Sequence, residues 1–181
     1  MGQDDQAALL TAIDDEFRAR ATYQAVLDAY GNIAPFSMIE QAERRHITAL
    51  ASLFQQYGMA VPADRWTGNV APPPSVLDAC QAGVDAEIAN YQMYDRLLQS
   101  VQDPQVRFVF TNLRNASAFH HLPAFQACAA ALGAQPAHVS PQPMTTMANE
   151  ETRANWGHLL IGALIGAGAV WAWRQWGRRT A

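Results

Sequence analysis

The sequence predicts an all-α protein, in which a four-helix bundle with a long crossover between its second and third helices precedes a single C-terminal membrane helix. Three observations lead to this prediction. Apolar residues recur with a period of about 3.5 in four segments between residues 6 and 132, as they do on the packing seam of a bundle. Residues 58–74 have no such period and contain four prolines. Residues 154–173 contain no Arg, Lys, Asp or Glu.

The first two segments predict a helical hairpin. Residues 6–31 form the first helix, and Gly31 ends it because glycine adopts the left-handed conformation of a helix C-cap. The second helix runs from Pro35 to Tyr57, with Pro35 near its first turn. The first seam consists of Leu9, Ile13, Glu16, Arg20, Tyr23, Leu27 and Tyr30, and the second of Ile39, Glu43, His46, Leu50, Leu53 and Tyr57.

The second pair of helices follows a connection long enough to cross the bundle. At ~3.3 Å per extended residue, residues 58–74 span ~50 Å, which exceeds the length of either helix before them at ~1.5 Å per residue. The third helix covers residues 76–101 with Ser75 as its N-cap, and the fourth begins at Asp103-Pro104 and ends at Gly133. Their seams consist of Leu77, Cys80, Val84, Glu87, Tyr91, Tyr94 and Leu98, and of Phe110, Leu113, Ser117, His120 or His121, and Ala124.

Polar residues stand on all four seams, where core side chains are expected. Glu43 and His46 are three residues apart, so they project from the same side of one helix. A buried carboxylate is costly unless it is paired or bound to a metal. Each such residue alone is more often a hydrogen-bonded core residue, but one on every seam together indicates a metal site. The candidate ligands are Glu16, Glu43, His46, Glu87, and His120 or His121.

Three sequence stretches resemble a ferritin-like family of prokaryotic proteins of unknown function, which is related to rubrerythrin and ferritin. They are DEFRARATY at 15–23, AERRH at 42–46, and residues 112–125 with HLPAF at their end. The resemblance covers roughly residues 6–132 and implies a di-metal carboxylate bundle, with Glu16, Glu43, His46 and Glu87 at ligand positions. On the fourth helix the family of rubrerythrin has a second Glu-x-x-His. This chain has Ser117 or Ala118 three residues before its histidines, so a mononuclear or otherwise incomplete site is the alternative to a di-iron one.

The donor atoms favour oxidoreductase chemistry. Carboxylates with imidazoles suit iron, with manganese as the alternative. Since carboxylates stabilise the ferric state and an open position admits oxygen or peroxide, the expected reaction is oxidation of Fe(II) or reduction of peroxide. The rival function is non-enzymatic: a helical subunit or assembly factor of a membrane protein complex, with a partial or vestigial metal site.

Two cysteines lie at matching distances from the candidate ligands. Cys80 comes seven residues before Glu87, and Cys128 comes seven residues after His121. On antiparallel neighbouring helices the two thiols would therefore lie at a similar height. A disulfide and a pair of buried thiols both fit this arrangement.

The charge distribution excludes one class of partner. Residues 1–152 contain all 16 acidic residues but only eight of the 12 basic ones, and all the basic residues are arginine. An acidic domain of this kind is a poor nucleic-acid binder, so we expect no nucleic-acid partner.

The C-terminal part predicts a linker and a membrane anchor. Residues 133–152 have the Pro-, Ser- and Thr-rich composition of a linker, and residues 153–176 predict a membrane helix with a basic end. Residues 154–173 would span ~30 Å of lipid. A tryptophan precedes the core of this segment and three follow, as in interfacial belts, and a G-x-x-x-G permits a homo-oligomer: Trp156, Trp171, Trp173, Trp176, Gly162 and Gly166.

Two signals disagree about the orientation of this single-pass anchor. The arginines that follow the apolar segment favour a cytoplasmic C-terminus and an exported bundle. The polar, acidic start of the sequence does not have the pattern of a signal peptide, which favours a cytoplasmic bundle. We take the exported bundle as the preferred expectation.

Overall fold

The structure is a computed structural model that describes residues 2–134. Within this range it is all-α, which confirms the predicted class. Its elements are α1 (Gln3–Tyr30), α2 (Phe36–Gln56), α3 (Val76–Ser100), α4 (Pro104–Ala116), a turn of π-helix η1 (Ser117–His121), and α5 (Leu122–Gly133). The predicted linker, from residue 135 on, and the predicted membrane helix at 153–176 lie outside the described residues. Among the helices of residues 2–134, none is long and apolar enough to cross a membrane.

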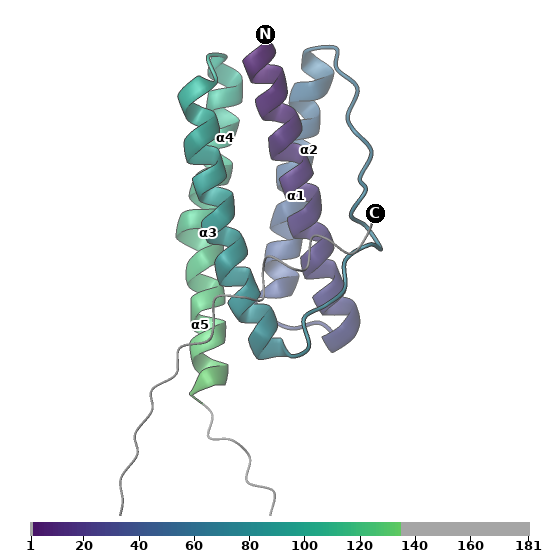
Figure 1. Ribbon diagram of the computed structural model, residues 1–181, viewed down its shortest axis with the longest axis vertical. Helices are drawn as coiled ribbons and strands as arrows, with labels where there is room; N and C mark the ends of the chain where they lie inside the picture. The colour runs from purple at the N-terminus through teal and green to yellow at the C-terminus, as the bar shows by residue number, and fades with distance from the viewer. Residues whose placement is uncertain (1, 135–181) are drawn as a thin grey trace, which may run out of the picture. The chain divides into compact units, whose positions relative to one another are not determined.

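The helices lie side by side as a bundle (Figure 1). α1 packs on α2 and on α3, and α3 also packs on α4, η1 and α5. α1 runs in the same direction as α4 and α5, whereas α2 and α3 run in the opposite direction. The segment between α2 and α3 returns along the outside of the bundle beside α1, so that α2 and α3 are parallel.

Charged and aromatic contacts hold this crossover segment on α1. Arg65 donates to both carboxylate oxygens of Asp14 at 3.0 and 2.8 Å, and the indole of Trp66 donates to Asp14 at 3.1 Å. Arg20, which the sequence pattern placed on the seam, is half-buried and forms an ion pair with Asp64 at 2.6 Å. The crossover is therefore a fixed part of the bundle surface.

Glycine and side-chain caps end the helices close to the predicted positions. Gly31 ends α1 with a φ of 83°, which glycine adopts at no steric cost, and its N–H donates to Leu27 O at 2.8 Å. Its ψ of −173° is extended, so it does not have the left-handed helical conformation that the sequence predicted. The hydroxyl of Ser75 accepts from Asp78 N at 3.1 Å. The carboxylate of Asp103 accepts from two backbone amides of the first turn of α4, where Pro104 lacks an N–H of its own.

The apolar core consists of two clusters. The larger, which we call the upper cluster, contains Leu9, Ile13, Leu50, Phe54, Tyr94, Val106 and Phe110 among others. The smaller, which we call the lower cluster, contains Tyr23, Val26, Phe36, Ile39, Ala79, Cys80 and Phe125. On α1 the buried Glu16 lies between Ile13 of the upper cluster and Tyr23 of the lower one. Along α3 the buried Glu87 and Asn90 separate the two clusters. The candidate ligands thus form a polar layer between two apolar ones.

A disulfide and a close aromatic contact join α3 to α5 in the lower cluster. Cys80 and Cys128 are bonded, with their Cα atoms 5.9 Å apart, which decides between the two arrangements that the sequence allowed. One turn along α3, the ring of Phe125 lies against Gly83, where a Cβ atom would stand 2.6 Å from the ring. Only glycine permits this approach.

We therefore expect Gly83→Ala to destabilise the protein by about 1–3 kcal/mol, because the added methyl group overpacks the core and this outweighs the better helix propensity of alanine. Chemical denaturation at equilibrium measures the change. Gly133→Ala is the matched control, since nothing lies within 4 Å of a Cβ at that position. A Gly83→Ala protein as stable as the Gly133→Ala protein would show that the Phe125 contact is not a packing constraint.

Candidate metal centre

The polar layer gathers five of the six predicted ligands from four elements. Glu16 comes from α1, Glu43 and His46 from α2, Glu87 from α3, and His121 from η1. The three carboxylates are at most 2% exposed and His121 is 5% exposed. His46 is partly buried, with 12% of its side chain exposed. Four ionisable groups buried in an apolar core are unusual, because each charge must be paired or coordinated to be tolerated.

The five side chains form two groups that share one member. Glu16, Glu43 and His46 form the first, and Glu43, Glu87 and His121 form the second. In each group the three donor atoms lie within 4.8 Å of one another, which is the spacing of ligands around one ion. Glu43 belongs to both.

Glu43 gives a different oxygen to each group. Its Oε2 lies 2.8 Å from His46 Nδ1, and its Oε1 lies 3.1 Å from His121 Nδ1. The two imidazole rings are stacked with their centroids 5.5 Å apart. If each group held a cation, Glu43 would be the residue that serves both.

The other two carboxylates each present one oxygen to a histidine and the other to a tyrosine. Glu16 Oε2 lies 3.2 Å from His46 Nδ1, and Glu87 Oε2 lies 3.4 Å from His121 Nδ1. Their Oε1 atoms accept hydrogen bonds of 2.6 Å from the hydroxyls of Tyr94 and Tyr23, respectively. These bonds fix the rotation of each carboxylate, as outer hydrogen bonds do for metal ligands.

The surroundings of His121 Nδ1 indicate whether the carboxylates and imidazoles of the layer suit a cation. This nitrogen is buried and near two carboxylate oxygens, yet neither contact has the direction of a hydrogen bond. An unpartnered buried nitrogen is costly. A cation held by His121, Glu43 and Glu87, whose donor atoms lie within 4.8 Å of one another, would supply the partner that this nitrogen needs, so these residues fit a metal.

The ionisation of the layer reflects its burial and its crowding. Burial raises the pKa of Glu16 to about 7, and repulsion by Glu43 acts in the same direction. For the histidines burial acts to lower the pKa, but interactions with the carboxylates outweigh it and raise the pKa of His46 to about 10 and that of His121 to about 9. Burial also acts to raise the pKa of Glu43, but contacts with both histidines hold it below its usual value.

The π turn selects His121 over His120. In η1 the N–H of Leu122 donates to Ser117 O, five residues back, so the turn contains one residue more than an α-helical turn. The inward positions consequently run Ser117, His121, Phe125, and His120 is exposed. Pro123 gives a physical reason for the wide turn, because a proline has no N–H and its ring crowds the carbonyl four residues earlier. The sequence pattern left both histidines open and placed Ala124 inward instead of Phe125.

A hydrogen-bonded network adjoins the layer on the side of α4, and sequence reasoning did not identify it. Ser117 donates to Asn90 Oδ1 at 2.7 Å, and Asn90 Nδ2 donates to Asp15 Oδ2 at 2.9 Å. Asn90 Nδ2 also lies 3.5 Å from Glu16 Oε1. A signal was present: Glu87 and Asn90 are spaced like Glu43 and His46, three residues apart on one helix face.

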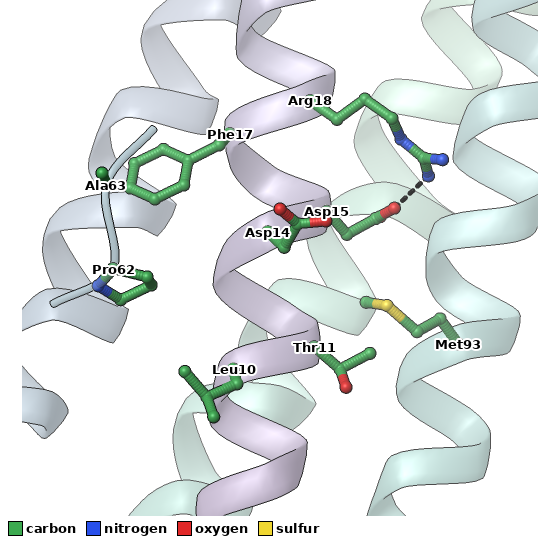
Figure 2. A pocket seen from close by; sticks show the side chains of 9 residues that line it. All are labelled: Leu10, Thr11, Asp14, Asp15, Phe17, Arg18, Pro62, Ala63 and Met93. Carbon is green, nitrogen blue, oxygen red and sulfur yellow. Dashed lines mark hydrogen bonds and ion pairs between the residues drawn. The ribbon is translucent and has the colours of Figure 1, made fainter. Parts of the chain in front are cut away.

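A surface pocket of about 490 Å³ approaches the layer from outside but does not reach it. Figure 2 shows its wall of α1 residues, the crossover residues Pro62 and Ala63, and Met93 of α3. None of the five layer ligands lines it. Asp15, paired with Arg18 in the pocket wall, connects it to the layer through Asn90.

Comparison with known proteins identifies a similar fold. No family model and no curated protein matches the chain. The crystal structure of the hypothetical protein MJ0754 from Methanococcus jannaschii DSM 2661 matches with a TM-score of 0.66 and 20% sequence identity, over 74% of this chain and 83% of that chain. At this identity the likeness concerns the fold alone.

The ionisation of the layer predicts how the metal-free protein responds to pH. The pKa values of Glu16, His46 and His121 are higher in the folded chain than in the unfolded chain. At a pH between the two pKa values of a group, the folded chain therefore keeps a proton that the unfolded chain has released. The stability from the histidines is complete below pH 6.5 and is lost as the pH rises towards 9 and 10. We expect the free energy of unfolding to fall between pH 6.5 and 9 in the presence of a chelator.

Denaturation at a series of pH values measures this slope. His46→Gln should make the free energy of unfolding depend less steeply on pH, because one titrating group is removed. His120→Gln changes an exposed side chain and should leave this pH dependence unchanged. A stability that is constant or rises over this interval in the unmodified protein would contradict the proposed ionisation.

Proposed function

We propose that this protein is a ferritin-like metal-binding protein that holds two iron ions in the polar layer and oxidises Fe(II) or reduces peroxide. The observation that carries the proposal is Glu43, whose two oxygens face two different groups of buried donors. A carboxylate shared in this way would hold both ions of a two-metal site. Manganese is the alternative metal, since it accepts the same oxygen and nitrogen donors.

The order of the helices supports the ferritin-like assignment. Bundles with one long crossover form the ferritin-like group, and their di-metal sites draw carboxylates and Glu-x-x-His pairs from facing helices. Here α2 supplies Glu43 and His46, while α1 and α3 supply one glutamate each. The crossover joins two parallel helices, as this topology requires.

Bound iron would supply the electrons, and the chain supplies the environment for their transfer. Its three carboxylates would offset most of the charge of two divalent cations, and two apolar clusters flank the layer. Tyr94 and Tyr23 hold Glu16 and Glu87 in the rotation that directs the second oxygen inward. Ser117 stands on η1 near the place of a fourth carboxylate, so this ligand set is one carboxylate short of the full di-metal set. A bound ion would then keep a coordination position for a small oxidant.

The serine at position 117, where a full di-metal site has a carboxylate, also favours a second function. A helical subunit of a membrane complex could retain a reduced metal site without turnover, and Ser117 in place of a carboxylate is what such a site would contain. In this alternative the predicted membrane helix at 154–173 is the functional part of the chain, because it docks the bundle on its partner.

The metal content of purified full-length protein tests the main proposal. We expect about two ions per chain after loading with Fe(II) under anaerobic conditions, since the donors form two groups. Glu43→Ala should lose both ions because it removes a donor from each group. His121→Ala should lose one, and His120→Ala should lose none because that residue is exposed. Equal metal content in the His120→Ala and His121→Ala proteins, with circular dichroism unchanged, would contradict the assignment.

Shortening the chain at Asn149 separates the two functions. If the protein is an enzyme, the shortened chain keeps the rate at which it oxidises Fe(II) or consumes peroxide. If it is a docking subunit, the shortened chain leaves the membrane fraction and loses any co-purifying partner, and neither form turns over. Full activity of the shortened chain in solution would exclude the non-enzymatic alternative.

A further inference from the structure

The disulfide lies close to the polar layer on both of the helices it joins. Cys80 is seven residues from Glu87 along α3, and Cys128 is seven residues from His121 along α5. Seven residues of α-helix correspond to a rise of about 10 Å. The two sulfur atoms are thus two helical turns below the candidate ligands, within the lower cluster.

Packed side chains fill the space between the disulfide and the layer. Cys80, Phe125 and Tyr23 belong to one buried cluster, and Cys128 packs against it. The rings of Phe125 and Tyr23 have their centroids 5.1 Å apart. The hydroxyl of Tyr23 then donates to Glu87 at 2.6 Å. A continuous path therefore leads from the cysteine pair through two aromatic rings to a ligand of the second group.

We propose that the Cys80–Cys128 pair is the internal two-electron reductant of the metal centre during peroxide reduction. The inference rests on the proposed function and names the source of its electrons. Tyr23 is the connecting group, because a phenol can give up and regain an electron while its proton stays in the hydrogen bond to Glu87. Phe125 packs on that phenol and belongs to the same buried cluster as Cys80.

The overall step is balanced. Two thiols become one disulfide, so the S–S bond forms and two electrons and two protons are released. Hydrogen peroxide accepts both, its O–O bond breaks, and two water molecules result. A dithiol reductant from solution resets the pair, and it would attack Cys128, which is half-buried, rather than Cys80, which is fully buried.

The experiment follows the thiols directly. Full-length protein is reduced with a dithiol, desalted, loaded with Fe(II) without oxygen, and analysed for metal. One equivalent of hydrogen peroxide is added, and free thiols and the intramolecular disulfide are measured over time by thiol titration and mass spectrometry. We expect both thiols to disappear at least about tenfold faster than in protein kept metal-free by a chelator, a difference in barrier far outside measurement error.

Two matched variants test the path. Tyr23→Phe and Tyr94→Phe each remove one hydrogen bond to an outer carboxylate, but only Tyr23 belongs to the cluster that contains the cysteines. With equal metal content, Tyr23→Phe should lose its thiols at least about tenfold more slowly than Tyr94→Phe.

The failures are distinguishable. A protein that retains no metal before peroxide is added overturns the proposed function, and the inference with it. A protein that retains metal but oxidises its thiols at the same rate with and without it overturns the inference alone. Equal rates in the Tyr23→Phe and Tyr94→Phe proteins would also overturn it, since the path would then have no special role.

Discussion

The burial of three carboxylates and two imidazoles in a thin layer between two apolar clusters is the constraint on which the rest of this structure depends. Charges at this depth destabilise a fold unless they neutralise one another or bind an ion. The helices therefore have to bring acids and bases to one height. Glu43 achieves this by standing between two histidines. The two apolar clusters flank the layer on either side.

Two tyrosines on the antiparallel helices α1 and α3 hold Glu16 and Glu87 by hydrogen bonds. Tyr23 follows Glu16 by seven residues on α1, and Tyr94 follows Glu87 by seven residues on α3. Because the helices run in opposite directions, each tyrosine reaches the glutamate of the other helix. One tyrosine extends from the lower cluster and the other from the upper, so the packing of each cluster is transmitted to one carboxylate.

Period and caps were enough to predict the helices and most of the layer, because glutamate and histidine at seam positions break an otherwise apolar pattern. The apolar period did not predict the buried residues correctly where the backbone departs from a regular α-helix, or where the buried face of a helix is shifted by one residue. The π turn before Pro123 adds a residue, and so the pattern could not choose between His120 and His121. On α3 the buried face includes Gly83 and Asn90 rather than Val84 and Tyr91, because Phe125 occupies the space that a side chain at 83 would fill. Such tertiary contacts have no signal in periodicity.

The central claim is that two cations occupy the layer with Glu43 between them, and anomalous X-ray scattering from crystals grown with iron or manganese tests it most directly. The account predicts two anomalous peaks per chain, one beside His46 and one beside His121, with Glu43 in contact with both. Crystals grown with saturating metal in which the layer holds no peak, and in which the carboxylates and imidazoles are hydrogen-bonded only to one another, would contradict it.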